Sequence, residues 1–431
     1  MSDKISIITL KILFYLIPIG LVTGPFIPDL SLSLIVLIFI FLSIKNNLWK
    51  YYYDNKFFKF FLLFNFYLII SSLVSDDISL SLKSSIGYFR FFIFSLAMWY
   101  LLENSGDLFK RSYSIYLFIL FLLLSLDALY QFKFTHNILG YEMSQQDRVS
   151  SFFNEKLVLG GFFARMFPLT IALFFMFSQL TNKFLLSLIL FLLGSLTIVL
   201  SGERTALGLF FILIFLIVLV HPGKKELLMP VILSIFLLIC FLIFNKQMQY
   251  RMFVEPLHQS NLISSSFLEK NFNKEKKEYS HDKDKLWIFS REHESHYKTA
   301  FKIFLDNPII GVGPKMFRKK CADKKYNSGE ESCSTHPHNL LLQILSETGI
   351  IGFIFYLVML YFIISKIINY FLNYKKYREV NYIKIICLIT LFINLFPFLP
   401  TGNIFNNWLS IIFYFPCGFL LHQINLKNRN E

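Results

Sequence analysis

Long apolar segments recur along the whole 431-residue chain, and they constrain its fold more than any other feature. Hydrophobic residues make up 55% of the chain and charged residues only 16%, well below the roughly 25% of soluble domains. Most segments are near the roughly 20 residues that a helix needs to cross a bilayer core. The sequence therefore predicts an all-α polytopic membrane protein with about twelve transmembrane helices. The predicted spans are 5–23, 26–44, 57–74, 86–102, 113–131, 157–178, 184–200, 205–220, 228–244, 339–365, 382–399 and 404–422.

The net charge is +14, and the positively charged residues lie in short loops. This distribution is typical of a membrane protein and disfavours nucleic acid as a partner. With a cytoplasmic N-terminus, the short loops of the opposite side contain only Lys83 and Arg204. We therefore expect both termini in the cytoplasm. The basic residues of the expected cytoplasmic loops are Lys45, Lys50, Lys56, Lys110, Arg111, Lys183, Lys224, Lys225, Lys375, Lys376, Arg378, Lys427 and Arg429.

One large polar segment, residues 245–338, lies on the outer side between the ninth and tenth spans. It divides the chain into spans 1–9 (1–244), this outer segment, and spans 10–12 (339–431). The mixed-charge run 274–278 is typical of a solvated excursion. The pattern from Asp284 to Asp306 predicts an amphipathic helix that ends at an Asn-Pro pair. Its expected apolar stripe consists of Tyr297, Phe301 and Phe304.

Two outer positions carry residue types suited to chemistry on an anion. His338 and Asn339 open the tenth span, where the helix dipole favours a neutral imidazole and free N–H groups suit an anion. The alternative is a His-Asn pair that only caps the helix. Arg204, in a short outer turn, can clamp a phosphate through two parallel hydrogen bonds. The alternative is an interfacial Arg that pairs with Glu203.

Three further charged residues are weaker candidates. Arg148 lies in the second-longest outer segment, where a loop charge near lipid headgroups is the alternative. Arg291 lies on the polar face of the predicted outer helix and could pair with Glu292 or Glu294 instead. Glu347 is an acid within the tenth span, and acids inside a membrane are costly and often functional.

Two cysteines of the outer segment, Cys321 and Cys333, lie just before His338. In an oxidising compartment they would form a disulfide, and closing a loop of about 13 residues is worth about 3 kcal/mol. A zinc site with His336 and His338 is the alternative, although the spacing matches no usual zinc pattern. We predict the disulfide and no metal.

The sequence from His336 to Gly352 resembles the hallmark of the O-antigen ligase family. That hallmark is His-Asn, nine residues, Gly, two residues and Gly, at His338, Asn339, Gly349 and Gly352 here. The preceding stretch 306–314 and the Ser-Gly-x-Arg turn at 201–204 also resemble the family. These blocks follow one another in order and share the outer side of the predicted topology.

The resemblance implies a metal-independent, cofactor-free glycosyltransferase at the periplasmic face of a bacterial inner membrane. The donor would be a glycan on undecaprenyl diphosphate, and the acceptor a sugar hydroxyl of the lipid A core. Arg204 and Arg291, with help from Arg148, would bind the diphosphate, and His338 would be the general base. Asn339 and Glu347 would contribute to substrate binding. Membrane lipid surrounds the spans.

Three alternatives stay open at this point, and one of them is a glycosyltransferase that acts on a protein acceptor. An O-antigen polymerase resembles the ligase in domain and donor but uses a second lipid-linked repeat unit as acceptor. A single dominant outer segment favours the ligase. A secondary transporter would show internal repeats and interrupted helices, and the sequence shows no repeat.

Overall fold

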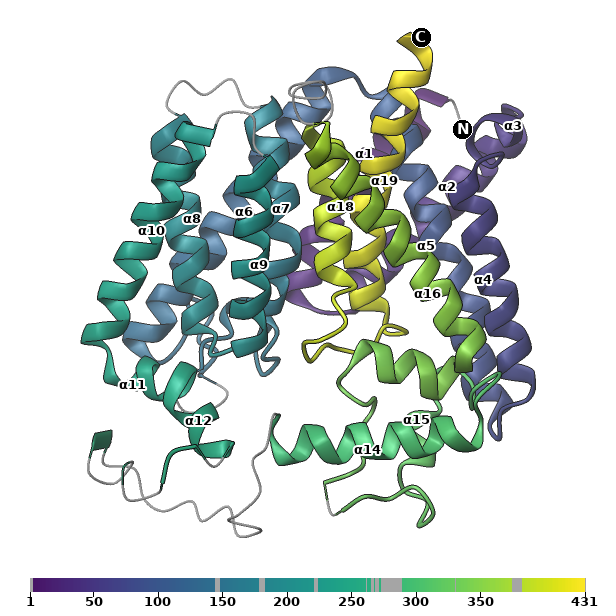
Figure 1. Ribbon diagram of the computed structural model, residues 1–431. Helices are drawn as coiled ribbons and strands as arrows, with labels where there is room; N and C mark the ends of the chain where they lie inside the picture. Colours follow the sequence, from purple (N-terminus) through teal and green to yellow (C-terminus); the bar gives the residue numbers. More distant parts are fainter. Residues whose placement is uncertain are drawn as a thin grey trace.

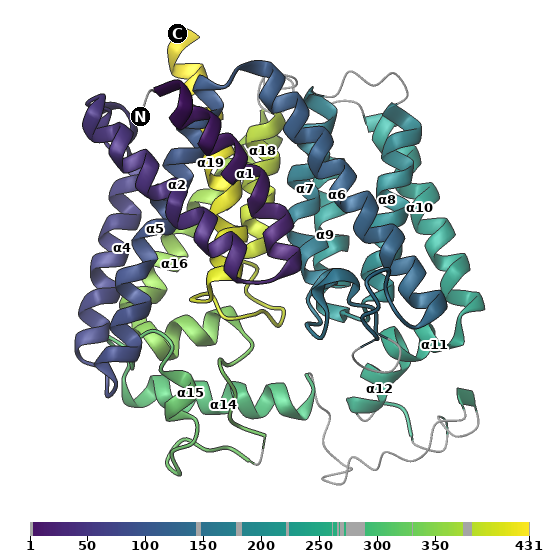
Figure 2. The same ribbon diagram turned by 180° about the vertical axis from the view of Figure 1, so that it is seen from behind.

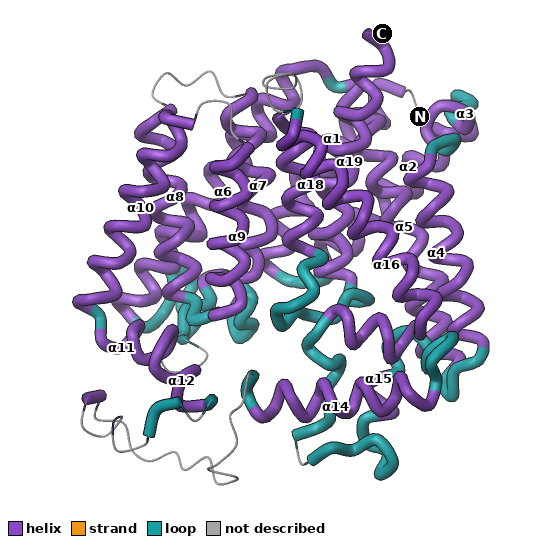
Figure 3. Tube along the Cα trace, viewed as in Figure 1, coloured by secondary structure: helices purple, strands orange, loops and turns teal. Residues whose placement is uncertain are grey.

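We describe a computed structural model of the chain, in which helices and loops account for nearly all of the described residues (Figures 1 and 3). One isolated bridge pairs His136 with Glu142. The structure describes residues 3–143, 148–177, 183–220, 224–260, 262–264, 267, 271–272, 289–329, 331–373 and 382–430.

Each predicted apolar segment contains a helix, which confirms the all-α class. The helices are Asp3–Thr23 (α1), Phe26–Lys45 (α2), Lys56–Leu73 (α4), Ile78–Asn104 (α5), Gly106–Phe134 (α6), Leu159–Phe177 (α7), Lys183–Leu200 (α8), Arg204–Val220 (α9), Lys224–Phe244 (α10), Leu340–Leu372 (α16), Tyr382–Asn394 (α18) and Asn407–Asn430 (α19). Shorter elements are Trp49–Tyr52 (α3), Ser151–Phe153 (η1), Lys246–Gln249 (α11), Tyr250–Val254 (η2), Glu255–Gln259 (α12), Arg291–Asp306 (α14) and Phe317–Lys320 (α15).

Six helices are long and apolar enough to cross a membrane, namely α1, α2, α4, α5, α6 and α16. The bent pair of α10 with the short helices after it would bring the number to seven among the described residues. Helices α7, α8, α9 and α18 are apolar but shorter. A multi-pass membrane protein follows from these helices, whereas the count of twelve crossings stays a prediction.

Helix α5 forms the centre of one half of the bundle. All residues from Phe91 to Leu102 are buried, as expected for a helix that other helices surround on every side. It packs against α2, α4 and α19. Ser95 Oγ donates a hydrogen bond of 2.8 Å to the carbonyl of Tyr414, and a side chain at Gly418 would collide with Met98. Close backbone approach therefore joins α5 to α19.

The start of α1 and the end of α19 lie at one end of the molecule, and α14 and α15 cross the opposite end (Figures 1 and 2). The chain bends by 101° after α10, so that α11 and α12 also lie at the α14 end. Residues from both halves of the sequence thus meet where α14 runs across the helix ends.

The amphipathic helix of the outer segment starts later than the sequence predicts. α14 begins at Arg291 behind its N-cap Ser290, whose side chain accepts a hydrogen bond from the backbone N–H of His293. The first predicted residues, from 284 to 288, and the charged run 274–278 lie outside the described residues.

The predicted apolar stripe is not the buried face of α14, since Phe301, one of its members, is 47% exposed. The buried face instead consists of His296, Thr299, Ala300 and Ile303. This face packs against α16, and small side chains such as Ala300 permit the close approach.

Candidate active site

A break in α16 sets the position of the site. Gly349 has φ 60° and ψ −166° inside the helix, a conformation that favours glycine. A side chain at Gly349 would collide with the carbonyl oxygen of Ile309. The backbone N–H of Ile350 donates to the carbonyl of Pro308 at 2.8 Å, and that of Gly313 donates to the carbonyl of Glu347 at 2.8 Å. The loop at 308–313 therefore enters the break and fixes residues 340–348 as a separate outer segment of α16.

The side chain of Glu347 braces this arrangement. It is fully buried, and its carboxylate accepts hydrogen bonds from the backbone N–H of Phe317 at 3.0 Å and from Gln343 Nε2 at 2.9 Å. Gln343 also donates to Asn403 at 2.8 Å. Glu347 thus joins α15, α16 and the loop before α19, and its contribution to substrate binding stays a prediction.

Asn339 caps α16. Its Oδ1 accepts a hydrogen bond of 3.0 Å from the backbone N–H of Leu342, and its Nδ2 donates to the carbonyl of Pro397 at 3.2 Å. With both ends of the amide engaged, the capping interpretation explains the residue type at this position. A role in substrate binding stays a prediction.

His338 precedes this cap in a left-handed conformation with φ 55°, which is uncommon for a residue other than glycine. Its carbonyl accepts a hydrogen bond of 2.9 Å from the backbone N–H of Thr401. Three imidazole rings surround the His338 ring: the centroid distances are 4.1 Å to His336, 5.2 Å to His296 and 5.5 Å to His293. We call these four residues the histidine cluster.

Hydrogen bonds orient two members of the cluster and define the tautomer of one. His336 Nε2 lies 3.2 Å from the carbonyl of Thr401, which can only accept, so Nε2 carries the proton. The Nδ1 of His336 then accepts from the hydroxyl of Thr335 at 3.0 Å. The Nδ1 of His293 lies 2.7 Å from Ser290 Oγ, which also accepts from the His293 backbone. The hydrogen bond to Ser290 fixes the orientation of the His293 ring.

The cluster is uncharged at neutral pH. Burial, followed by the three neighbouring imidazoles, lowers the pKa of His338 to about 3. Burial lowers the pKa of His336 to about 4, and the pKa of His296 is also lowered by burial. His338 is partly exposed, so its neutral ring can accept a proton from a bound hydroxyl.

An arginine cluster, which we define as Arg148, Arg204 and Arg251, lies at the same end of the molecule. Arg204 Nη2 and Arg251 Nη1 each lie 2.6 Å from the same oxygen of Glu255. Gln259 accepts from Arg204 Nη1 at 2.8 Å. Arg204 thus projects from the start of α9 onto α12, instead of standing alone in its turn.

Arg148 and Arg251 meet above Gly202, which has φ 65°. A side chain at Gly202 would place its first carbon 3.3 Å from the Nε of each arginine, so both guanidinium groups border one point. Arg148 Nε also donates to the carbonyl of Ser201 at 3.1 Å. The Ser-Gly-x-Arg turn therefore needs glycine because two arginine side chains pass over it.

Glu203 does not pair with Arg204, contrary to the simplest alternative. Its carboxylate accepts hydrogen bonds from the backbone N–H groups of Gly160 at 2.7 Å and Gly161 at 3.0 Å, at the start of α7. Burial raises the pKa of Glu203 to about 7, and the charge of Arg148 opposes that rise. The turn at 201–204 is thereby fastened to α7.

The charge of Arg204 reaches the histidine cluster at His293. Burial lowers the pKa of His293, and the charge of Arg204 lowers it further, against the opposing effect of Glu292. Arg165 of α7 donates to Thr401 Oγ1 at 3.2 Å, and Thr401 holds both His336 and His338 through its backbone. The start of α14 points toward α12 in both views (Figures 1 and 2). Arg204 thus acts electrostatically on one of the four imidazoles.

Arg291 is the first residue of α14 and is partly buried. It precedes His293 by two residues and so lies at the end of α14 that carries His293 and approaches α12. Its role toward a diphosphate stays a prediction.

Cys321 and Cys333 form a disulfide, with their Cα atoms 5.0 Å apart. The bond uses the thiolates that the zinc alternative requires. Among the described residues, no group of three or more His, Cys, Asp or Glu side chains could hold a metal ion. The disulfide joins α15 to the loop that leads to His336.

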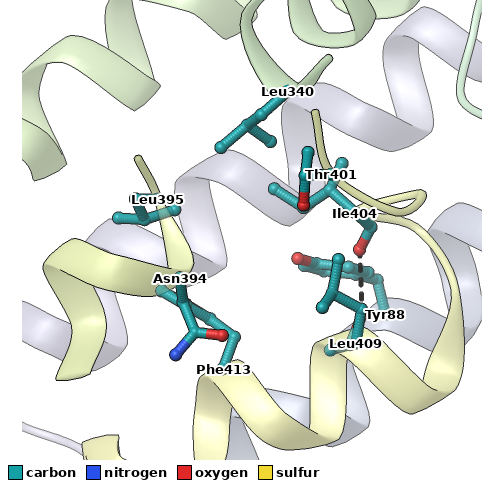
Figure 4. A pocket seen from close by; sticks show the side chains of 9 residues that line it. Tyr88, Leu340, Asn394, Leu395, Thr401, Ile404, Leu409 and Phe413 are labelled. Carbon is teal, nitrogen blue, oxygen red and sulfur yellow. Dashed lines mark hydrogen bonds between the residues drawn. The ribbon is translucent and has the colours of Figure 1, made fainter. Parts of the chain in front are cut away.

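A small cavity is lined by Leu340, at the start of α16, and by Thr401 (Figure 4). None of its lining residues is charged. A diphosphate would find no counter-charge there, so the arginine cluster is the better candidate for that group. The other lining residues are Tyr88, Asn394, Leu395, Ile404, Leu409, Ser410 and Phe413.

The sequence reasoning missed four residues of the site: His293, His296, Arg251 and Glu255. The spacing of His293 and His296 on one predicted helix, with His-Pro-His before the tenth span, could have indicated a histidine cluster. Arg251 and Glu255, four residues apart, could have indicated an ion pair, although not its contact with Arg204.

The fold defines the class of the protein as a multi-pass helical membrane protein, with the histidine cluster and the arginine cluster beyond its helix ends. Comparison with family models gives a match over part of the chain. Residues 189–357 match the model described as O-antigen ligase, which confirms the resemblance over that part of the chain. The matched range includes Arg204, Arg291, His338 and Gly349, and Arg148 precedes it. A comparison with curated proteins finds no match.

Proposed function

We propose that the protein is an O-antigen ligase, transferring a glycan from undecaprenyl diphosphate to a sugar hydroxyl of the lipid A core. The observation that carries the proposal is the neutral, partly exposed His338 ring in a cluster whose member His293 feels the charge of Arg204, with all three residues within the range that matches the family. A base and a phosphate-binding group are the two functions that this transfer requires.

The reaction exchanges one bond for another at the anomeric carbon. The acceptor oxygen attacks this carbon, the bond to the diphosphate oxygen breaks, and His338 takes the proton of the hydroxyl. Undecaprenyl diphosphate leaves with the bonding electron pair, and Arg204 and Arg291, with help from Arg148, stabilise its charge. Because the pKa of His338 is lowered to about 3, the ring is neutral and free to accept that proton.

The proposed location is the bacterial inner membrane, with the α14 end in the periplasm and both termini in the cytoplasm. Three features support this orientation: the distribution of Lys and Arg, the Cys321–Cys333 bridge, and the termini at the end opposite α14. A lipid-linked donor would enter from the bilayer, which the apolar helices border.

A deletion strain tests the proposal, with its lipopolysaccharide analysed on a gel. We expect core-only molecules, with polymer retained on the undecaprenyl carrier and restored to the core by the wild-type gene. Core that bears one repeat unit would instead identify a polymerase. An unchanged ladder would contradict both activities.

A transporter is the alternative from another class. It predicts flux of a substrate across proteoliposomes without glycan transfer. Flux of that kind from the purified protein would overturn the enzyme proposal.

A further inference from the structure

All three nitrogen atoms of Arg204 donate to residues 251–259. Its Nε donates to the carbonyl of Arg251 at 3.1 Å, its Nη1 to Gln259 at 2.8 Å and its Nη2 to Glu255 at 2.6 Å. These bonds hold the guanidinium in place, and Nη1 and Nη2 each carry a second N–H besides the one that donates here. Arg204 is thus positioned by this segment, with Glu255 as its anionic partner.

Arg251 differs from Arg204 in having a buried nitrogen atom that donates no hydrogen bond. Its Nη1 donates to Glu255 at 2.6 Å, but its Nε is buried and makes no hydrogen bond within the part of the chain described here. A buried donor without an acceptor destabilises the folded protein, and more so when the group is charged. This Nε borders the point above Gly202 that Arg148 Nε also borders.

The one carboxylate oxygen that joins Arg204 and Arg251 has the geometry of a bound anion. Glu255 Oε2 lies 2.6 Å from both guanidinium groups, and the side chain of Glu255 is only 13% exposed. The positive charge of Arg251 also reaches Arg148, so three guanidinium groups gather around this point. A phosphate carries the same acceptor chemistry with more negative charge.

We propose that Glu255 occupies, in the donor-free protein, the position of a phosphate of the lipid diphosphate, and that Arg251 binds that phosphate together with Arg204 and Arg148. This inference rests on the proposed function, because that function supplies the diphosphate. Donor binding exchanges one anion for another: Glu255 leaves the two arginines and the phosphate takes its place.

The local structure suits such an exchange. Glu255 begins the five-residue helix α12, directly after the π-helical turn Tyr250–Val254 that carries Arg251. Turns of this kind interrupt regular helix geometry and occur often at functional sites. A change in this short segment would move Glu255 without moving helix α9, which begins at Arg204, or the loop before η1, which carries Arg148.

The test measures binding of undecaprenyl diphosphate to the full-length protein in detergent, by the rise in Tm with ligand concentration. Glu255→Gln keeps the shape of the side chain and removes the competing charge, so we expect roughly tenfold tighter binding. Arg251→Gln removes a ligand, so we expect roughly tenfold weaker binding. Glu155→Gln, at an exposed outer-loop position, is the matched control and should bind like the wild type.

The outcomes separate the inference from the function on which it rests. A wild-type protein that does not bind the lipid diphosphate contradicts the proposed function. A wild-type protein that binds, together with a Glu255→Gln variant that binds no more tightly, overturns the role of Glu255. Hydrogen exchange of the wild type gives a test without substitution: ligand should increase exchange at 255–259, and unchanged exchange there overturns the inference.

Discussion

At the scale of the residue, His338 is neutral first because it is buried and second because three other imidazoles surround it. His336 is held by Thr335 and Thr401, and His293 by Ser290, so these rings have defined orientations around His338. A protonated ring in this group would lie beside three others with little exposure to water. The cluster thereby keeps the base free of a proton until a substrate brings negative charge near it.

This environment predicts the pH dependence of transfer. Since the pKa of His338 is lowered to about 3, its ring stays deprotonated as pH falls from neutral until it approaches that value. We expect kcat/KM of the reconstituted enzyme to show no acid limb near pH 6.5, the ordinary value for histidine. Loss of activity with a midpoint near 6.5 would contradict this account of the cluster.

The cysteines make a second prediction at this scale. The sequence has five cysteines, and the structure leaves Cys240, Cys387 and Cys417 as free thiols. Denatured, unreduced protein should therefore give three thiols per chain, and reduced protein five. Five thiols before reduction would rule out the Cys321–Cys333 bridge.

At the scale of the element, the broken helix α16 explains why the family hallmark contains glycines well away from the histidine. Gly349 interrupts the helix, and the loop that carries Gly311 fills the gap. A side chain at Gly311 would lie 2.5 Å from the carbonyl carbon of Glu347, so neither position can hold another residue without movement of the backbone. The glycines thus affect His338 indirectly, because they determine where the outer segment of α16, which follows His338, is held.

Gly349→Ala tests this explanation. The left-handed φ and the contact with the Ile309 carbonyl should both make alanine unfavourable at this position. We expect the substitution to lower the free energy of unfolding by more than about 1 kcal/mol. We expect a lower Tm and loss of transfer. Gly87→Ala, within α5 and with open space around it, is the matched control and should keep the wild-type Tm. Equal stability of the two variants would contradict the account of the break.

The elements also show what the sequence could predict. The lengths of the apolar segments predicted where the long helices lie, because a helix that contacts lipid or other helices along its whole length needs apolar residues along that length. Hydropathy alone could not predict the buried face of α14. The small side chains of Thr299 and Ala300 are buried because they allow close packing against α16, whereas the large Phe301 faces outward. Arg204 and His338 were predicted from position and resemblance. Arg251 and Glu255 were not, because only the bend after α10 brings them to Arg204.

At the scale of the whole molecule, the chain places both termini at one end and the two clusters at the other (Figure 1). Segments far apart in sequence build the site: the loop before α7, the turn before α9, α12, α14 and the start of α16. A single outer segment thus contributes only part of the site, and the remainder comes from short loops between helices.

This arrangement predicts the topology. Lys50 and Lys324 are both exposed, at the terminal end and the α14 end respectively. In intact cells with a permeable outer membrane, a membrane-impermeant maleimide should label Lys324→Cys and should label Lys50→Cys only after lysis. The wild type is the control for native cysteines. Labelling of both variants in intact cells would contradict the orientation.

The most direct measurement of the central claim is glycan transfer by purified His338→Ala in proteoliposomes, with donor and acceptor supplied. His136→Ala is the matched control, since His136 is an exposed outer-loop histidine that is not part of the histidine cluster. We predict transfer and release of undecaprenyl diphosphate by the wild type and His136→Ala, and at least a 100-fold loss in His338→Ala, about the lower limit for removal of a general base. Wild-type transfer by a folded His338→Ala protein would contradict the account.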